Sequence, residues 1–253
     1  MKMVWQELAM VIFFFFLASA VSVWAIPTKI VVGIKARDAK FIGTSMGGVL
    51  VLIQDVETGE LLAKGYVEGS TGDTKLLMET PKERYTKLIV GNTARFEAHL
   101  DLKEPRKVKI IARGPLAQPQ AVQEVSVTTW VVPGKDINEL VLEMPGLVVR
   151  ALSPAAHTKV KGPAKVKVVA SVTPMCGCPV DPRFYWKPED YEVAVIVKKN
   201  GQYFQTYPLK FAGETNIFQT DLQLEKGVYE FIVYAYDAKT GNTGVDKTTI
   251  IVK

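Results

Sequence analysis

The sequence predicts an all-β protein built from two tandem β-sandwiches that follow an N-terminal export signal. Apolar and polar residues alternate with a period of two along most of the chain, which is the pattern of half-buried strands. Clusters of Gly, Pro, Asp and Asn interrupt the alternation roughly every ten residues, and no long stretch has helical periodicity. Short strands separated by frequent turns are typical of sandwiches and barrels.

The first element is an apolar run over residues 8–26 that includes Phe13 to Phe16. Lys2 precedes the run, and small residues lie near its end at Ala20 and Ala25. This order of charge, apolar core and small-residue cleavage site indicates a secretory signal peptide, to which we assign residues 1–25. The alternative is an uncleaved anchor helix, because the run approaches the ~20 residues that span a bilayer. We expect a secreted, periplasmic or cell-surface protein that contacts a membrane only through residues 8–26, if these stay uncleaved.

The first sandwich is expected over residues 27–147. Turn signals such as Thr71-Gly72-Asp73 and Pro133-Gly134 separate its strands. Pro81 to Arg84 is the one place where we expect a short helix to open. The expected strands are 30–35, 48–55, 61–68, 94–102, 106–113, 123–132 and 139–143.

The second sandwich is expected over residues 148–253, because Met144-Pro145-Gly146 ends the first set of strands and Ser153-Pro154 begins another. Lys199-Asn200-Gly201-Gln202 predicts a hairpin, since Asn and Gly suit its two left-handed positions. The expected strands are 164–173, 191–199, 203–211, 216–222, 228–236 and 243–252.

Two family resemblances follow from these patterns. The first half resembles the transthyretin-like, carboxypeptidase-regulatory-like sandwich through residues 51–55 with 58–60, then 63–65, 94–96 and 100–102. The second half is similar to immunoglobulin or fibronectin type III sandwiches, because residues 224–229 resemble the tyrosine corner. The usual pair of inter-sheet cysteines is absent. Both resemblances imply modules that serve as spacers, adhesion units or partner-binding platforms.

Charge excludes one class of partner. Lys and Arg total 31 against 26 for Asp and Glu, and the basic residues do not cluster as a nucleic-acid site requires. Lys107 and Lys109 alternate with apolar residues, as do Lys165 and Lys167. We therefore expect these lysines to form the solvated faces of strands.

The only two cysteines lie in Met175-Cys176-Gly177-Cys178-Pro179. Export favours a disulfide between Cys176 and Cys178. Met175, Cys176 and Cys178 could alternatively hold Cu(I), which prefers soft sulfur ligands. A third interpretation is thiol–disulfide exchange, which strained small-ring disulfides favour.

The aromatic run Phe184-Tyr185-Trp186 allows two interpretations. Adjacent rings in a loop can form a flat surface for a sugar or a protein partner. Alternatively, the rings cap the sandwich core, with Trp186 buried.

Two further motifs resemble functional sites but lack the features that those sites require. Gly43-Thr44-Ser45-Met46-Gly47 matches the nucleophile elbow of serine hydrolases, but a strand is expected after it where the elbow needs a helix. Asp237, Asn242 and Asp246 place oxygen atoms around a hairpin, yet without the spacing of a calcium loop. We expect no cofactor and no catalytic residue.

The sequence therefore predicts a non-enzymatic extracytoplasmic protein that acts as a structural or protein-interaction module. Its expected partner is an envelope or extracellular protein, and exposed sheet edges leave self-assembly open. The alternatives are a periplasmic copper-binding or thiol-redox accessory protein and a carbohydrate-binding accessory module.

Overall fold

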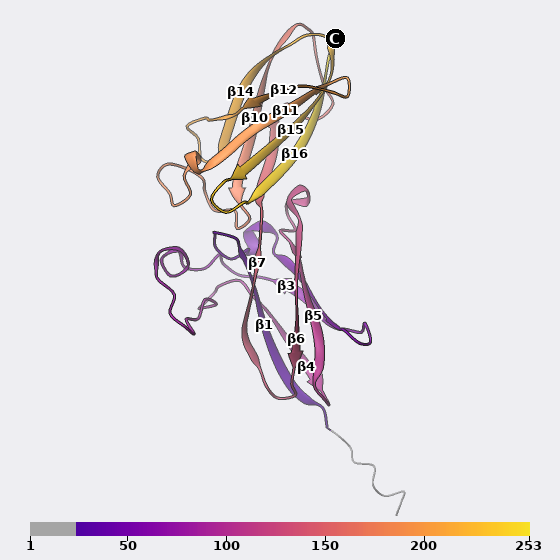
Figure 1. The fold of residues 1–253 in the computed structure, drawn as a ribbon, viewed down its shortest axis with the longest axis vertical. Helices are drawn as coiled ribbons and strands as arrows, with labels where there is room; N and C mark the ends of the chain where they lie inside the picture. Colours follow the sequence, from indigo (N-terminus) through magenta and orange to yellow (C-terminus); the bar gives the residue numbers. More distant parts are fainter. Residues whose placement is uncertain (1–23) are drawn as a thin grey trace, which may run out of the picture.

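The computed structural model describes residues 24–253, so the predicted signal peptide lies almost entirely outside the described residues. Two β-sandwiches stand end to end along the long axis of the molecule (Figure 1). Between residues 24 and 253, no helix combines the length and the apolar character needed to cross a bilayer. The all-β fold expected from the alternation is confirmed.

The first sandwich packs a three-stranded sheet against a four-stranded one. In the smaller sheet, the central strand β1 pairs antiparallel with β4 and parallel with β7. In the larger sheet, β3, β2, β5 and β6 follow one another and pair antiparallel. The strands span Ile26–Ala36 (β1), Val49–Asp55 (β2), Leu61–Val67 (β3), Phe96–Leu102 (β4), Arg106–Gly114 (β5), Gln123–Val131 (β6) and Ile137–Met144 (β7), and short helices span Thr44–Met46 (η1), Lys75–Glu79 (η2) and Pro119–Ala121 (η3).

The second sandwich packs a four-stranded sheet, in the order β13-β14-β10-β8, against a five-stranded sheet, in the order β12-β11-β15-β16-β9. This order reproduces the two sheets of the immunoglobulin fold. Its elements span Leu147–Ser153 (β8), Thr158–Val160 (β9), Ala164–Pro174 (β10), Pro188–Asp190 (helix η4), Tyr191–Lys199 (β11), Gln202–Pro208 (β12), Lys210–Phe211 (β13), Ile217–Leu224 (β14), Gly227–Asp237 (β15) and Thr243–Val252 (β16).

Two local predictions in this sandwich are confirmed. The hydroxyl of Tyr229 donates a hydrogen bond to the carbonyl of Glu225 at 2.9 Å, which is the tyrosine corner. Asn200 and Gly201 both have positive φ, of 52° and 83°, as the two-residue hairpin turn requires.

The structure corrects three predictions about elements. The expected strand 203–211 is two strands in different sheets, β12 and β13, because Pro208 has no N–H with which to continue the ladder. Helix η2 lies at 75–79 and not at 81–84, because Pro81 confines Thr80 to extended backbone, with φ −83° and ψ 128°. Strands β8 and β9 were not expected, and β9, with three residues, is too short to show a period.

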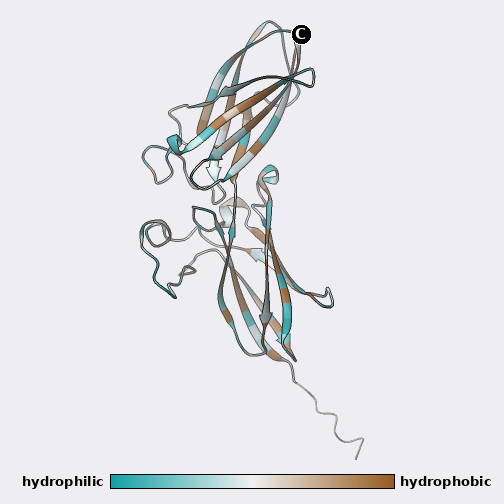
Figure 2. Cartoon of the chain, viewed as in Figure 1, coloured by the Kyte–Doolittle hydropathy of each residue, from teal (hydrophilic) through white to brown (hydrophobic). Residues whose placement is uncertain are grey.

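Alternation places one side of each strand in the core and the other in solvent (Figure 2). In β5, Val108 and Ile110 are fully buried, whereas Lys107 and Lys109 are exposed as predicted. The buried apolar side chains form one cluster that continues through both sandwiches. Its members between the sandwiches include Met46, Met144, Leu147, Met175 and Trp186.

Residues 68–95 connect β3 to β4, and Leu88 and Ile89 of this connection lie on the outer face of the three-stranded sheet. A Cβ atom added to Gly33 of β1 would lie 2.7 Å from the Cδ1 atom of Ile89, so the loop packs directly on the strand. The carboxylate of Glu139 in β7 accepts hydrogen bonds from the backbone N–H groups of Leu88 and Ile89, at 2.9 and 3.3 Å. The sheet thus holds this long connection through both packing and hydrogen bonds.

Candidate functional site

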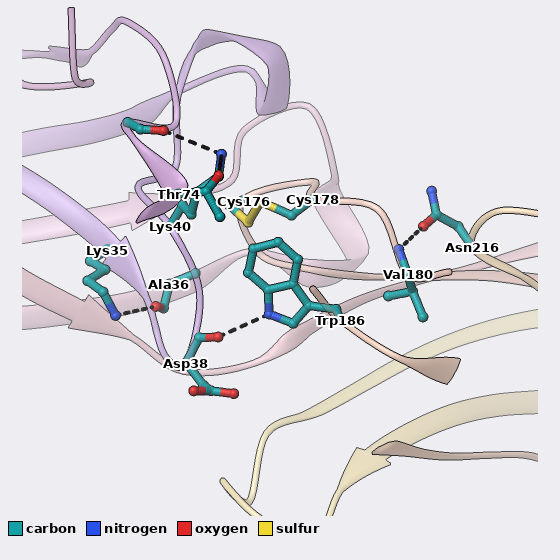
Figure 3. Close-up of a disulfide and its surroundings, with 11 residues drawn as sticks. Lys35, Ala36, Asp38, Lys40, Thr74, Cys176, Cys178, Val180, Trp186 and Asn216 are labelled. Atoms are coloured by element: carbon teal, nitrogen blue, oxygen red, sulfur yellow. Dashed lines mark hydrogen bonds between the residues drawn. A yellow bond between two sulfur atoms is a disulfide. The ribbon is translucent and has the colours of Figure 1, made fainter. Parts of the chain in front are cut away.

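The residues singled out by the sequence gather where the two sandwiches meet. The connection from β10 to β11 carries both the cysteine motif and the aromatic run to this junction (Figure 3). Its Trp186 side chain is only 6% exposed. The indole Nε1 donates a hydrogen bond to the carbonyl of Asp38, at 3.1 Å, in the turn that follows β1.

Local hydrogen bonds fix the shape of this connection. The Asp181 carboxylate accepts from the backbone N–H and the guanidinium of Arg183 and from the hydroxyl of Thr215. These donors, the guanidinium first, hold the pKa of Asp181 well below its usual range. Asn216 accepts a hydrogen bond from the Val180 N–H at 2.6 Å. The buried carboxylate therefore serves the loop as an anion that orders the backbone.

The cysteine motif is buried against the first sandwich. Cys176 and Cys178 form a disulfide with their Cα atoms 5.4 Å apart, and Met175, Cys176 and Cys178 are 0%, 1% and 4% exposed. Gly177 has φ of 72°, and a Cβ atom there would meet the Met46 sulfur of helix η1. The glycine is required both by its backbone conformation and by this close approach.

In the disulfide form the motif offers neither thiolate nor free thiol. Cu(I) binding needs thiolate ligands, and exchange needs access to a sulfur atom. Burial and the S–S bond therefore point to a structural role for Met175, Cys176 and Cys178. Among residues 24–253, no group of three or more His, Cys, Asp or Glu side chains is arranged to hold a metal ion.

Asn242, in the β15–β16 hairpin, forms hydrogen bonds to both sides of the junction. Its Oδ1 accepts from the Gly146 N–H at 2.9 Å, and its Nδ2 donates to the carbonyl of Arg37 at 3.1 Å. One side chain thus bridges the linker, the turn after β1 and the β15–β16 hairpin. Gln120 adds a further bond to the carbonyl of Val149. A hydrogen bond of this kind contributes about 1 kcal/mol net.

A polar cavity of about 290 Å³ lies beside Trp186. Burial raises the pKa of Asp38, and the nearby Asp237 carboxylate raises it further. Asp237 accepts hydrogen bonds from the Lys239 N–H and the Thr240 hydroxyl, while Asp190 pairs with the Lys239 ammonium. Asp237 and Asp190 are thus already engaged by protein groups.

The oxygen atoms considered for calcium serve separate structural roles. Asp237 stabilises its own hairpin turn, Asn242 bonds to Gly146, and Asp246 accepts the Ala151 N–H at 2.8 Å. Calcium needs six to eight oxygen ligands around one point. Each of these three side chains binds a different backbone segment of the described residues, so they do not gather around one point.

The aromatic run does not form a surface of three rings. Phe184 and Tyr185 are 45% and 44% exposed, but Trp186 is buried in the junction. The rings of Tyr185 and Trp186 meet edge to face, with centroids 5.1 Å apart. Trp186 therefore acts in packing, and only the two neighbouring rings face solvent.

The serine motif has a different setting from that of a nucleophile elbow. Helix η1 holds Ser45 at an exposed position, and β2 follows after the turn at Gly47 and Gly48. An elbow needs a strand before the serine and a longer helix after it. Residues 43–47 therefore match the motif in residue types but not in structure.

Sequence reasoning missed the residues of the first sandwich that complete the junction. The sequence pointed to Met46 only as part of the serine motif, to Asn242 only as a turn residue or calcium ligand, and to Asp38 not at all. Asp38 has a positive φ of 54°, which marks a turn but does not identify its partner. The partners lie in the other sandwich, far away along the chain, and no local pattern encodes them.

No family model matches the chain, and no curated protein matches it. Solved structures resemble it weakly. The fibronectin(III)-like modules of Clostridium thermocellum CbhA are 13% identical with a TM-score of 0.30, covering 81% of this chain and 77% of that one. The titin domains z1z2 in complex with telethonin are 10% identical with a TM-score of 0.27, covering 90% and 96%.

An engineered protein is 20% identical with a TM-score of 0.33, and the match covers 46% of this chain but only 22% of that protein. The immunoglobulin-like description of the second sandwich therefore rests on its own strand order and tyrosine corner. The transthyretin-like resemblance of the first sandwich stays a prediction.

Proposed function

We propose that this chain is a non-enzymatic, extracytoplasmic module whose two sandwiches form one rigid body that binds another protein. The observation that carries the proposal is the continuous buried cluster across the junction, completed by Trp186 and the Asn242 bridge. A shared apolar core resists relative motion of two domains, whereas a small polar contact does not.

Two observations support a location outside the cytoplasm. The disulfide between Cys176 and Cys178 suits an oxidising compartment. The order of residues at the N-terminus is that of an export signal.

Chemical cross-linking in the intact envelope of the source cells, followed by mass spectrometry, tests the proposal. We expect the chain outside the cytoplasm, with its two cysteines bridged and with adducts to protein. A cytoplasmic chain with two reduced thiols, or one that forms no protein adduct at saturating cross-linker, would contradict it.

The alternative functions have less support. Copper or redox chemistry would require reduction of a disulfide that is buried between the sandwiches. Titration of the reduced protein with Cu(I) separates the two interpretations, because a copper site would lose affinity in Cys176→Ser and in Cys178→Ser. A sugar platform would have to rely on Phe184 and Tyr185 without Trp186.

A further inference from the structure

The outer face of the five-stranded sheet has an apolar centre that nothing covers within residues 24–253. Strands β11, β15 and β16 lie on the near side of the second sandwich in Figure 1, with no other segment over them. Their outward positions are set by alternation with the buried Val195, Val233 and Ile250. The outward-facing Ala194 is itself buried, at 4% exposure. The other apolar outward residues are Ile196, Val228, Ile232, Tyr234, Val245 and Ile251.

We call this surface the β11–β16 face. Cross-strand pairing joins its residues into rows: Ala194 lies beside Tyr234 and Tyr234 beside Val245. In the next row, Ile196 lies beside Ile232, and Ile232 lies beside the exposed Lys247 of β16. Val245 is 44% exposed. Val228 and Ile251 lie beyond the row of Lys198, Glu230 and Thr249, so the apolar centre consists of Ile196, Ile232, Tyr234 and Val245. An exposed apolar patch rimmed by charge marks interaction sites.

Charge changes sign along the outward row of β11. The outward residues of this strand run Glu192, Ala194, Ile196, Lys198. Along β11 a carboxylate therefore lies at one end and an ammonium at the other, and the Glu230 carboxylate of β15 lies beside that ammonium. When two copies stack face to face with their β11 strands antiparallel, Glu192 of each copy faces Lys198 of the other, and Ala194 faces Ile196.

Contacts within the sheet hold both charged groups in place on this face. The Tyr234 hydroxyl donates a hydrogen bond to the Glu192 carboxylate at 2.6 Å. The Lys198 ammonium lies 3.3 Å from the Glu230 carboxylate on β15. Both contacts join neighbouring strands across the outer surface, so the charges are oriented before any partner binds.

We propose that the β11–β16 face binds a second copy of this chain through a two-fold axis that lies between the two sheets, perpendicular to the strands. The same axis brings Tyr234 of one copy against Ile232 of the other, and Val245 against the aliphatic stem of Lys247. Such an interface is isologous, with each contact made twice. Sheets commonly pack face to face at about −30°.

This inference rests on the proposed role as an interaction module and names its partner. A partner could instead bind by adding a strand to the edge strand β12, but the structure of this edge argues against it. The ladder between β11 and β12 has an irregularity at Val197 and Lys198, and β12 ends at Pro208. Bulges and prolines protect sheet edges against such pairing.

Charge-reversal variants test the two-fold arrangement by sedimentation velocity and light scattering. We expect the purified chain to dimerise in the micromolar range. Glu192→Lys places two ammonium groups opposite each other at both ends of the interface, and Lys198→Glu does the same with carboxylates. Each variant should weaken the dimer at least about ten-fold, because facing like charges oppose association.

The decisive sample is an equimolar mixture of the two variants. In a heterodimer, the lysine introduced at position 192 of one copy faces the glutamate introduced at position 198 of the other. The second end keeps the native pairing of Glu192 with Lys198, so both ends carry opposite charges again. The mixture should dimerise within about three-fold of the original chain. Lys167→Glu, which reverses an exposed charge on the opposite sheet, is the matched control and should leave the dimer unchanged.

Ile232→Asp provides a test at the centre, with folding checked by circular dichroism. It should abolish dimerisation while keeping the β-spectrum. A monomeric wild-type chain at about 0.5 mM, or variants that fail to restore each other, would overturn the inference. A monomer that still cross-links to a different envelope protein would overturn it while leaving the proposed function standing.

Discussion

The outer faces of two sheets differ in what lies over them. In the first sandwich, Leu88 and Ile89 of the connection 68–95 pack on the outer face of the three-stranded sheet. In the second sandwich, no other segment of the described residues covers the outer face of the five-stranded sheet. The covered face holds Val31 at 6% exposure beneath its loop. The bare face presents Ile232, Tyr234 and Val245 outward. The chain thus buries the apolar outer residues of one domain itself and leaves those of the other for a partner.

The four-stranded sheet of the first sandwich gives a second contrast. Its outer face carries Lys109, Thr128 and the ion pair of Arg113 with Glu124, with the exposed ring of Trp130 beside them. Between these charges Leu52 lies beside Ile111, and Leu50 lies beside the exposed Tyr66, so this face also has an apolar centre. Both outer faces therefore have apolar residues at their centre and charged residues around them, and the β11–β16 face differs in the order of the charges along β11.

The largest effect is expected at the junction that joins the two sandwiches. Trp186→Ala removes a buried ring and the bond to Asp38, and should lower the free energy of unfolding by about 3–5 kcal/mol. Trp186→Phe retains most of the packing and should cost clearly less. Urea unfolding measures both, and equal losses in the two variants would show that ring volume is not what matters.

A larger side chain at Gly33 should disrupt the packing of the connection 68–95 on the three-stranded sheet. In Gly33→Val the new atoms would overlap Ile89 and Phe41, so we expect a loss of about 1–3 kcal/mol from overpacking. Limited proteolysis should then cut within residues 68–95 faster than in the unaltered chain. Unchanged cleavage there would show that the loop does not depend on contact with β1.

A moderate effect is expected at the tyrosine corner of the second sandwich. Tyr229→Phe keeps the buried ring and loses only the hydrogen bond to Glu225. The expected loss is about 0.5–1.5 kcal/mol, measured by thermal unfolding. A loss as large as that of Trp186→Ala would mean that the corner organises the whole domain.

Acid should weaken the turn after β2. The Thr58 N–H, the Arg106 guanidinium and the Glu57 N–H lower the pKa of Asp55 to about 2. A carboxylate with a depressed folded-state pKa stabilises the fold above its unfolded pKa of about 4, and this stabilisation is lost as pH falls toward 2. Urea midpoints across this range should fall less steeply in Asp55→Asn than in the original chain. Parallel curves would exclude Asp55 as a source of acid sensitivity.

The smallest effect on stability is expected for a substitution on the β11–β16 face. Ile232→Ser changes a partly exposed residue, and its effect on unfolding of the monomer should stay within about 0.5 kcal/mol. The effect on self-association should be much larger. A strong loss of monomer stability would mean that Ile232 belongs to the core rather than to an interface.

Most of the fold could be predicted from the sequence because period-two alternation directly reports which residues face the core. The Asn200-Gly201 turn and the Tyr229 corner were equally predictable, since each depends on a few neighbouring residues. The division of strand 203–211 was not, because it depends on where Pro208 meets β11. No strand was expected at residues 147–153, where the boundary between the sandwiches was placed, since the pairing that makes them β8 lies with β10.

The sequence predicted only those residues of the candidate site that lie in the second sandwich. The sequence singled out Cys176, Cys178 and Trp186 because their residue types are rare and chemically distinctive. It could not show that they face inward, since burial depends on Met46 and Asp38 of the other sandwich. The β11–β16 face is present in the sequence as apolar residues on both sides of each strand, but its meaning required the cross-strand register.

The claim that the two sandwiches form one body is tested most directly by differential scanning calorimetry of the intact chain. A shared core predicts a single transition whose calorimetric and van't Hoff enthalpies agree, and predicts that Trp186→Ala resolves it into two. Two separate transitions in the unaltered chain, neither shifted by the Trp186 substitution, would contradict it.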